Sequence, residues 1–264
     1  MKLHNERDMK FVVRDKTFES GTHVMGILNA NDTSFFALSR IFDDEVARAE
    51  KMLVDGAEII DVGGQSTAPN AVRVSEIEEA SRVLPVIERI KGELPDAIIS
   101  VDTFYSSVAE EALALGADMI NDVSCLGDKF MADVVAKYGA SICVMHNRRG
   151  SKNPDMWLDK ELGLMRATDT LLRAGVDKNK IILDGGIGFN LNHNEDRELL
   201  QRYNRLDTLG YPLLLGASRK SFLGGEVEGR LSATLDTTRL AVKQKILFVR
   251  VHDVKENKLT IDLG

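Results

Sequence analysis

The chain has 264 residues, of which 44% are hydrophobic and 28% charged, with a formal net charge of −7 and a pI of about 5.4. This length provides a sizeable core for one large domain or two small ones. There is no long basic run or basic-aromatic patch, so we do not expect nucleic acid as a partner. The polar start MKLHNERDMK is unlike a signal peptide, and no apolar stretch approaches the roughly 20 residues of a membrane span. Cys125 and Cys143 lie far apart in apolar contexts, which favours buried thiols over a disulfide or a metal pair. These features predict a cytoplasmic protein that does not bind membranes.

In chain order, the first predicted element is a hairpin over residues 9–21, MKFVVRDKTFESG. After it, short apolar runs predict eight strands, at 23–29, 58–64, 97–102, 118–122, 141–146, 180–184, 212–218 and 247–253. Amphipathic, helix-like patterns lie between them, at 43–55, 74–94, 106–115, 156–174 and 194–209. Ser75 is followed three residues later by Glu78, which is a capping-box pattern for the second of these helices.

The alternation of strand and helix predicts parallel pairing, because parallel neighbours need a crossover. Eight such units in about 250 residues predict an α/β fold, the (β/α)8 TIM barrel, with the N-terminal hairpin closing its bottom. A doubly wound open sheet is the alternative, but eight evenly spaced units favour closure. We expect a single domain over residues 1–264, since no linker or low-complexity segment interrupts the pattern. The last segment, VKENKLTIDLG, is short for an eighth barrel helix.

Polar side chains follow the predicted strands, at the end of the barrel where this fold places its chemistry. In chain order they are Asn29, Asp61, Asp102, Asn121 with Asp122, His146 with Asn147, Asp184, Ser218 leading to Lys220, and Arg250 with His252. Carboxylates and amides come from the first six strands, and cations come from the last two.

Each of these residues also has a purely structural interpretation. An aspartate such as Asp61 or Asp122 at a strand end is about as often a turn former as a ligand group. A single buried histidine is more often part of a core than a catalyst, and Lys220 beside Arg219 suits a solvated rim. The convergence of all these groups changes the balance, because a ring of inward polar groups is unfavourable without a ligand or water.

The chemistry of the strand-end groups indicates two kinds of ligand. Asp102, Asn121 and Asp184 suit a planar heterocycle with a guanidine-like edge, because a carboxylate accepts two parallel N–H bonds. The groups that suit a phosphate-type anion are Asn29, Lys220, Arg250 and His252. Residues and spacing therefore predict an acidic floor for a heterocycle and a cationic wall for an anion, without naming the molecule.

Eight segments resemble the dihydropteroate synthase family, in the family's order and over nearly the full length. They are MGILN (25–29), DVGGQST (61–67), ISVDT (99–103), GADMINDVS (116–124), VMHNR (144–148), LDGGIGF (183–189), SRKSFLG (218–224) and RVHDV (250–254). One such motif is weak, but eight together are specific. The resemblance implies that the chain joins 6-hydroxymethyl-7,8-dihydropterin diphosphate to 4-aminobenzoate in folate biosynthesis, releasing diphosphate. It further implies a dissociative reaction, Mg²⁺ as a cofactor, a homodimer and a sulfonamide target.

The resemblance also assigns roles, position by position. It places the pterin against Asp102, Asn121, Met145, Asp184, Phe189 and Lys220. It makes Asn29 the magnesium ligand and places the diphosphate against Asn29, Arg250 and His252. The aminobenzoate site would be lined by Phe35, Thr67, Pro69 and Ser221, and the catalytic residues would be Asp102, Lys220 and Asp32.

Two loops depart from the family's pattern. The first reads LNANDTSFFALS where the family has LNxTPDSFSD, so Thr33 and Ala37 stand in place of two aspartates. Asp32, one residue earlier, is the candidate to replace the first of them. In the second loop, QSTAPN, Ala68 stands where the family has an arginine.

A third departure follows the sixth strand, where the family's Asp-Pro-Gly becomes Asp184-Gly185-Gly186. This change keeps the carboxylate and frees the backbone.

The loop departures leave alternative functions open. Loss of one oriented charge at a transition state costs about 100–1000-fold in rate. A weakened paralogue that binds pterin without efficient condensation is therefore the main alternative. A pterin-dependent methyltransferase is disfavoured by SRKSFLG and RVHD and by the lack of a cobalamin-binding module. A barrel without a pterin site is disfavoured by the eight matched segments.

Overall fold

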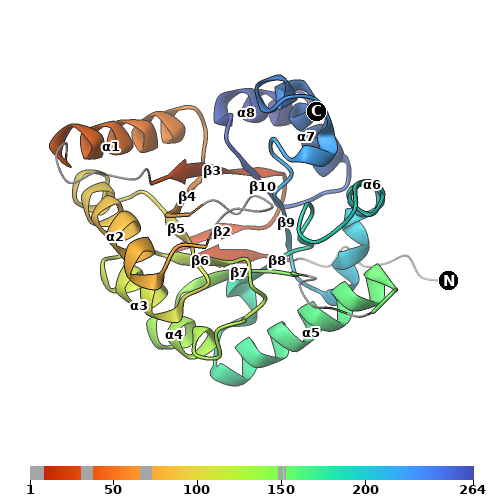
Figure 1. Cartoon of the computed structure of the whole chain (residues 1–264), viewed down its shortest axis with the longest axis horizontal. Coiled ribbons are helices and arrows are strands. Elements are labelled where there is room, and N and C mark those ends of the chain that lie inside the picture. Colours follow the sequence, from red (N-terminus) through yellow and green to blue (C-terminus); the bar gives the residue numbers. More distant parts are fainter. Residues whose placement is uncertain (1–8, 31–37, 66–72, 148–150, 152) are drawn as a thin grey trace.

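The computed structural model describes residues 9–30, 38–65, 73–147, 151 and 153–264, and it is an α/β barrel (Figure 1). Eight parallel strands close on themselves in the order β10-β3-β4-β5-β6-β7-β8-β9. They are β3 (His23–Asn29), β4 (Ile59–Gly63), β5 (Ile99–Asp102), β6 (Met119–Asp122), β7 (Ser141–Met145), β8 (Ile181–Asp184), β9 (Leu213–Leu215) and β10 (Phe248–Val251). Each lies within one of the eight predicted runs, and the prediction of a (β/α)8 TIM barrel is confirmed.

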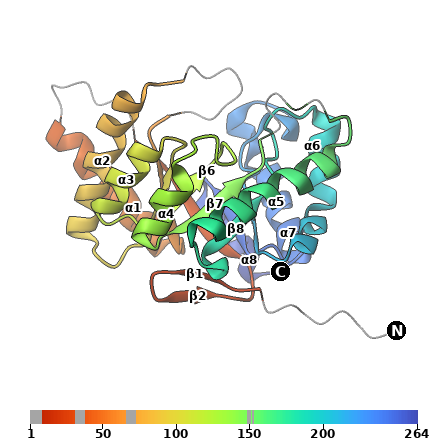
Figure 2. The ribbon, with the colours of Figure 1, turned by 90° about the horizontal axis from the view of Figure 1, so that it is seen from below.

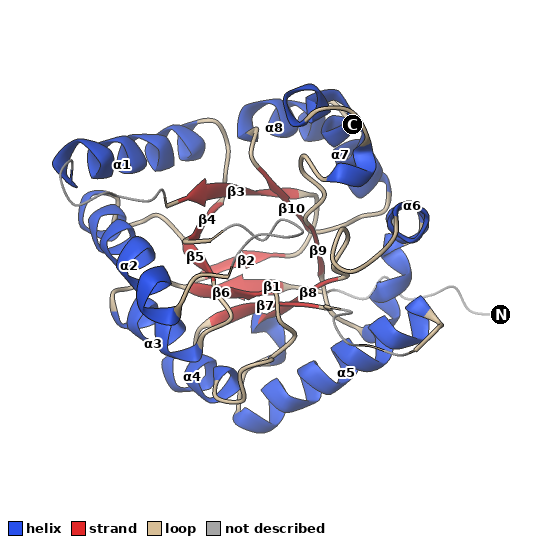
Figure 3. Cartoon of the chain, in the orientation of Figure 1, coloured by secondary structure: helices blue, strands red, loops and turns tan. Residues whose placement is uncertain are grey.

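The helices form a ring around the strands, as Figure 3 shows by colour. They are α1 (Leu38–Val54), α2 (Glu76–Glu93), α3 (Ser106–Ala114), α4 (Met131–Tyr138), α5 (Met156–Ala174), α6 (His193–Gln201), α7 (Leu231–Lys243) and α8 (Val254–Asp262). The short 3-10 turns are η1 (Lys178–Lys180), η2 (Tyr203–Leu209), η3 (Ser221–Leu223) and η4 (Val227–Arg230). Within the described ranges, no helix is both long and apolar enough to cross a membrane.

The N-terminal hairpin lies across one end of the barrel, as predicted (Figure 2). Strands β1 (Phe11–Val13) and β2 (Lys16–Phe18) pair antiparallel, with Phe11 opposite Phe18. The hairpin's apolar side chains are buried in one cluster with residues from the beginnings of the barrel strands. The hairpin therefore closes the bottom of the barrel with apolar surface.

Two helical segments differ in detail from the sequence-based expectation. Ser75 accepts a hydrogen bond from the Glu78 amide at 3.2 Å, as in a capping box, but the Glu78 carboxylate pairs with Arg82 at 2.6 Å. The single helix predicted at 194–209 was wrong: α6 ends at Gln201, and η2 follows it. The φ of −127° at Arg202 interrupts the helix and brings the Tyr203 side chain into the core, where it is fully buried.

The C-terminal segment, although short, is long enough to complete the barrel. Its helix α8 has nine residues, the same length as α3 and α6. It packs against α7 and β3, so the eighth strand-helix unit is complete.

Alternate residues of the strands face the barrel interior in layers. The layer next to the hairpin is apolar and consists of Met25, Ile59, Ile98, Met119, Cys143, Ile182, Leu214 and Phe248. Two residues further along their strands come Asp61, Asn121, Asp184 and Arg250, and the same alternation brings Asp102 inward on β5. The polar layer of the interior is thus a consequence of strand parity.

Candidate active site

A buried charge cluster lies in the polar layer of the barrel. Arg250 donates from Nε to Oδ2 of Asp61 at 2.5 Å and from Nη2 to Oδ2 of Asp102 at 2.6 Å. Asn121 donates from Nδ2 to the same Asp61 oxygen at 3.0 Å. The other Asp61 oxygen, Oδ1, is buried and has no hydrogen-bond partner among the described residues. The guanidinium group of Arg250, on β10, therefore links a carboxylate of β4 with a carboxylate of β5, although β3 lies between β10 and β4.

Burial and charge set the protonation of this cluster. Burial raises the pKa of Asp102 to about 7; Arg250 opposes that shift and Asp61 adds to it. Burial disfavours the charged form of Arg250, but Asp61 and Asp102 outweigh this and raise the pKa of the guanidinium above its usual range. The cluster therefore keeps its cation at neutral pH, while Asp102 is close to its own titration.

Asp184 lies at the end of β8 and is held by two donors. Its Oδ1 accepts from the Gly186 amide at 2.7 Å and lies 2.8 Å from the Tyr203 hydroxyl. That hydroxyl also accepts from the Gly185 amide at 2.7 Å, and its single proton is shared between Asp184 and the Leu214 carbonyl oxygen, which lies 2.6 Å away. Burial raises the pKa of Tyr203 well above its usual value, and the Asp184 charge adds to the shift. Tyr203 is therefore a neutral donor at every working pH.

Lys220 and Phe189 form the adjoining side of the site. The Lys220 amine donates to the Ile187 carbonyl and lies 4.2 Å from the centre of the Phe189 ring. Burial lowers the pKa of Lys220 to about 8, although the Asp184 charge acts in the opposite direction. A cation over an aromatic face, close to a carboxylate, suits a flat polar ring.

The rim between β9 and β10 carries a second set of polar groups. Ser218 Oγ lies 2.9 Å from Nδ1 of His252. Arg219 donates to both oxygens of Asp253, at 3.0 and 2.5 Å. Burial lowers the pKa of His252 to about 4, and Arg219 and Arg250 contribute in the same direction. His252 is therefore a neutral imidazole at pH 7.

Other residues chosen from the sequence are placed as follows. Met145 is 2% exposed at the end of β7. Asn29 ends β3 with an exposed side chain, and Ser221 is exposed at the start of η3. Asp32, Phe35, Thr67 and Pro69 lie outside the described residues, as do Thr33, Ala37 and Ala68. In the part of the chain that is described, no cluster of three or more His, Cys, Asp or Glu side chains could hold a metal.

Two strand-end residues face away from the barrel interior, because neighbours in a strand alternate. Asp122 follows the inward Asn121, and its carboxylate accepts from the Ser124 and Leu126 amides, both at 2.7 Å. Its interpretation as a turn former is confirmed. His146 follows the inward Met145 and lies behind the strand.

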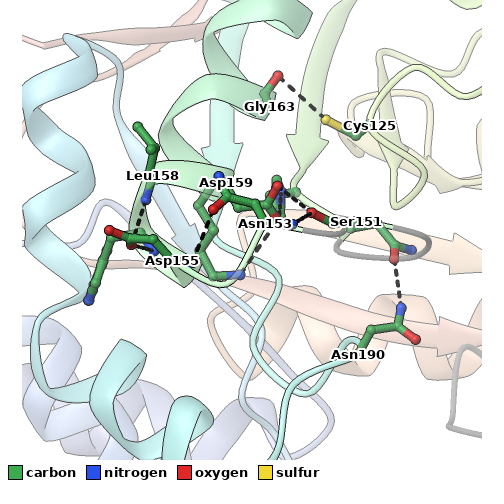
Figure 4. Close-up of polar contacts among 12 residues, drawn as sticks. Cys125, Ser151, Asn153, Asp155, Leu158, Asp159, Gly163 and Asn190 are labelled. Carbon is green, nitrogen blue, oxygen red and sulfur yellow. Dashed lines mark hydrogen bonds and ion pairs between the residues drawn. The ribbon is translucent and has the colours of Figure 1, made fainter.

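The surroundings of His146 belong to the β7–α5 connection and to α5 itself. Its Nε2 lies 3.5 Å from Oδ2 of Asp159. Figure 4 shows Asp159 with Ser151, whose hydroxyl donates to Asp159 Oδ1 at 2.6 Å. The same view contains Asn190, which donates to Asn147 at 2.8 Å.

Three residues of this region were missing from the site predicted from the sequence. Asp61 was among the strand-end residues but was not given a ligand role. The alternation of side chains along its strand, which turns Asp61 inward like Arg250 and Asn121, would have indicated that it belongs to the site. Tyr203 and Lys160 lie in helical stretches. Their contacts, of Tyr203 with Asp184 at 2.8 Å and of Lys160 with the Gly185 carbonyl at 2.6 Å, depend on the tertiary structure.

The arrangement combines two sets of groups. Asp184, Asp102 and Asn121 offer acceptors and an amide to an edge rich in N–H groups. Lys220 and Phe189 offer a cation and a flat face. Such a site is suited to bind a heterocycle and to stabilise positive charge that develops on it.

Comparison with known proteins gives consistent matches. Residues 25–252 match the family described as pterin binding enzyme. A dihydropteroate synthase of Clostridium beijerinckii is 42% identical over 255 residues, covering 93% of this chain and 94% of that protein. A dihydropteroate synthase of Bacillus subtilis is 42% identical over 247 residues, covering 91% of this chain and 86% of that protein.

Solved structures agree with these sequence matches. The Clostridium difficile dihydropteroate synthase, solved in the presence of pteroic acid, superposes with a TM-score of 0.88 at 41% identity, covering 93% of this chain and 96% of that one. The Xanthomonas albilineans enzyme, solved with 4-aminobenzoic acid, gives a TM-score of 0.85 at 32% identity, with 92% of each chain covered.

Proposed function

We infer that this chain, which belongs to the pterin-binding enzyme family of the dihydropteroate synthases, is a transferase of folate biosynthesis. It condenses 6-hydroxymethyl-7,8-dihydropterin diphosphate with 4-aminobenzoate to give 7,8-dihydropteroate and diphosphate. The observation that carries this inference is the carboxylate layer of Asp184 and Asp102 inside the barrel, next to the Lys220 amine and the Phe189 ring.

The pterin is proposed to lie over this layer. Asp184 accepts from the N–H groups of its guanidine-like edge, since Oδ1 is already held by Gly186 and Tyr203 and the carboxylate is thereby oriented. Asp102 and Asn121 bind the adjoining polar edge, and Met145 and Phe189 pack on the two faces of the ring. Lys220, on the same side as Phe189, donates to the remaining ring acceptors.

The diphosphate is proposed to lie at the rim, against Asn29, Arg250 and His252. Because the imidazole of His252 is neutral at pH 7, its share is a hydrogen bond and the charge comes from Arg250. Arg250 is bound to Asp61 and Asp102, so it contributes to anion binding from a fixed position.

Magnesium fits this rim as an ion held mainly by substrate. Mg²⁺ commonly binds through one or two protein oxygens together with phosphates and water. The exposed amide of Asn29 at the end of β3 provides one such oxygen. When bound, the ion would stabilise charge on the leaving diphosphate.

The chain's own residues are proposed to assist a dissociative reaction. As the bond to diphosphate breaks, positive charge grows on the pterin, and the carboxylates of Asp102 and Asp184 stabilise it without reorganisation. The 4-aminobenzoate nitrogen then attacks the exocyclic carbon and loses a proton. Ser221 and the residues of the two loops, Phe35, Thr67 and Pro69, are proposed to hold 4-aminobenzoate, with Asp32 as the loop carboxylate.

The remaining expectations follow from the resemblance. We propose a homodimer located in the cytoplasm, and sulfonamides as competitors for the 4-aminobenzoate site. These are testable by light scattering and by inhibition that 4-aminobenzoate relieves.

The test of the proposed function is a condensation assay. Purified protein, Mg²⁺ and the dihydropterin diphosphate are incubated with and without 4-aminobenzoate, and dihydropteroate and diphosphate are measured. Product that depends on 4-aminobenzoate is expected, and Asp184→Asn should weaken pterin binding by about tenfold or more in calorimetry, since it replaces a charged acceptor. Pterin binding without product would instead identify the weakened paralogue, and a gain on introducing Thr33→Asp with Ala68→Arg would locate the defect in the loops.

A further inference from the structure

Lys160 is a fully buried lysine outside the residues to which a role has been assigned above. It lies in the first turns of α5 and is 0% exposed. Its amine donates to the carbonyl oxygen of Gly185 at 2.6 Å and lies 3.5 Å from Nδ1 of His146. A buried amine is unfavourable unless it is hydrogen-bonded, so its direction is well defined by these partners.

The Gly185 carbonyl belongs to the peptide group that holds Asp184. The oxygen of Gly185 and the amide of Gly186 are the two ends of one planar peptide. Lys160 binds the oxygen end, and the amide end donates to Oδ1 of Asp184 at 2.7 Å. A donor on one end and an acceptor on the other fix the orientation of the whole plane, and such linked hydrogen bonds strengthen one another.

This peptide has little intrinsic restraint. It joins two glycines, and Gly186 has a φ of +70°, so rotation of the plane meets no side chain of its own. Gly185 stands where the resemblance has proline, whose ring would have fixed one of the neighbouring torsions. External contacts must therefore hold the plane, and on the oxygen side the described contact is Lys160.

We propose that Lys160 is a positioning residue of the pterin site: by holding the Gly185 carbonyl, it keeps the Gly186 amide directed at Asp184 and so orients the carboxylate for the heterocycle. This rests on the pterin-binding role proposed for Asp184. Lys160 does not touch the substrate; it acts through one peptide plane. Its loss should therefore affect the pterin and leave the 4-aminobenzoate site unchanged.

The test compares Lys160→Met, which keeps an unbranched stem and removes the donor, with Leu164→Ala. Leu164 is also fully buried in α5, one turn further on, and controls for general loosening of this helix. In Lys160→Met, affinity for the dihydropterin diphosphate in calorimetry should fall by about tenfold or more. KM for that substrate should rise, while KM for 4-aminobenzoate changes by less than about twofold. Lys160→Arg, which retains a donor, should recover most of the affinity.

A second readout does not depend on ligand or activity. With ¹⁵N-glycine labelling, the Gly186 amide should exchange its hydrogen slowly in the parent protein and about tenfold or more faster in Lys160→Met. In Leu164→Ala, pterin affinity should stay near the parent value. Its Gly186 exchange should also stay near the parent rate once the variant's lower global stability is taken into account.

Unchanged pterin affinity and unchanged Gly186 exchange in Lys160→Met would overturn the proposal, and so would equal losses in Leu164→Ala. If Lys160→Met does not fold, Lys160→Gln carries the same test, because its amide is polar but one atom too short for the Gly185 oxygen. If the parent protein binds no pterin at all, the proposed function fails, and the Gly186 exchange rates alone still decide whether Lys160 holds the peptide.

Discussion

Replacing Arg250 with methionine is expected to destabilise the fold strongly, because it removes the cation from a buried pair of carboxylates. The Arg250 side chain is 17% exposed, while those of Asp61 and Asp102 are 0% and 6% exposed. Without Arg250, the Asp61 carboxylate keeps one side-chain partner among the described residues, the Asn121 amide. Methionine keeps much of the volume and an unbranched stem, so the variant mainly tests the charge.

The expected loss is about 3–5 kcal/mol of the free energy of unfolding, the range for removing one partner of a buried ion pair. Arg219→Met is the matched control, since Arg219 also pairs through two nitrogens, with Asp253. Its side chain is 39% exposed, so solvent screening limits the expected loss to about 0–1 kcal/mol.

The loss should also grow with pH. Burial raises the pKa of Asp102 to about 7 in the folded protein, above the roughly 3.9 of an unfolded chain. The folded state therefore binds the Asp102 proton more tightly than the unfolded chain does. The contribution of Asp102 to the free energy of unfolding is complete at low pH and is lost as the pH rises through about 7. Removing Arg250 raises the pKa of Asp102 further, so Arg250→Met should be closer to the parent at pH 5 than at pH 8.

Urea unfolding followed by circular dichroism, at several pH values, measures these differences. Adding Asp61→Asn to Arg250→Met should recover part of the loss, with a coupling of about 0.5–3 kcal/mol for groups in contact. Additive effects of the two substitutions, or an Arg250→Met loss as small as that of Arg219→Met, would refute this account of the cluster.

Three further predictions concern the Asp184 side of the site. Tyr203→Phe removes the hydroxyl that binds Asp184 and the Gly185 amide and should weaken pterin binding in calorimetry by about 1.5–3 kcal/mol; an unchanged Kd would show that Asp184 is held by other groups. Gly186→Ala should abolish folding, as judged by soluble yield and Tm, because the new Cβ would lie 1.9 Å from the His146 carbonyl oxygen at a φ of +70°. Gly21→Ala is the control: its φ is +76° and nothing lies within 4 Å of the new Cβ, so it should lose only the backbone strain of about 1 kcal/mol. Burial lowers the pKa of Lys220 to about 8, so its cation is present below that pH and kcat/KM for the dihydropterin diphosphate should decline as the pH rises above it; in Lys220→Arg this decline should move to higher pH, and a decline that stays in place would assign it to another group.

The sequence by itself was sufficient for the barrel and for the choice of candidate residues at its strand ends. Strand and helix periods are local properties of the chain, so they locate all eight strands and the closing hairpin without any tertiary contact. Strand parity is also local and separates Asp61, Asn121, Asp184 and Arg250 from Asp122 and His146. The expected ring of inward groups did not use parity, so it was wrong for Asp122 and His146. The candidate residues at the strand ends follow from these two periods.

Only the tertiary structure decided which of these residues meet. Asp61 and Arg250 are 189 positions apart, and they pair because barrel closure sets β10 and β4 on either side of β3. The break after α6 turns Tyr203 toward Asp184, and α5 carries Lys160 to the Gly185 carbonyl. No pattern along the chain marks either contact, because a hydrogen bond between distant elements depends on how those elements pack and not on the periodicity of either one.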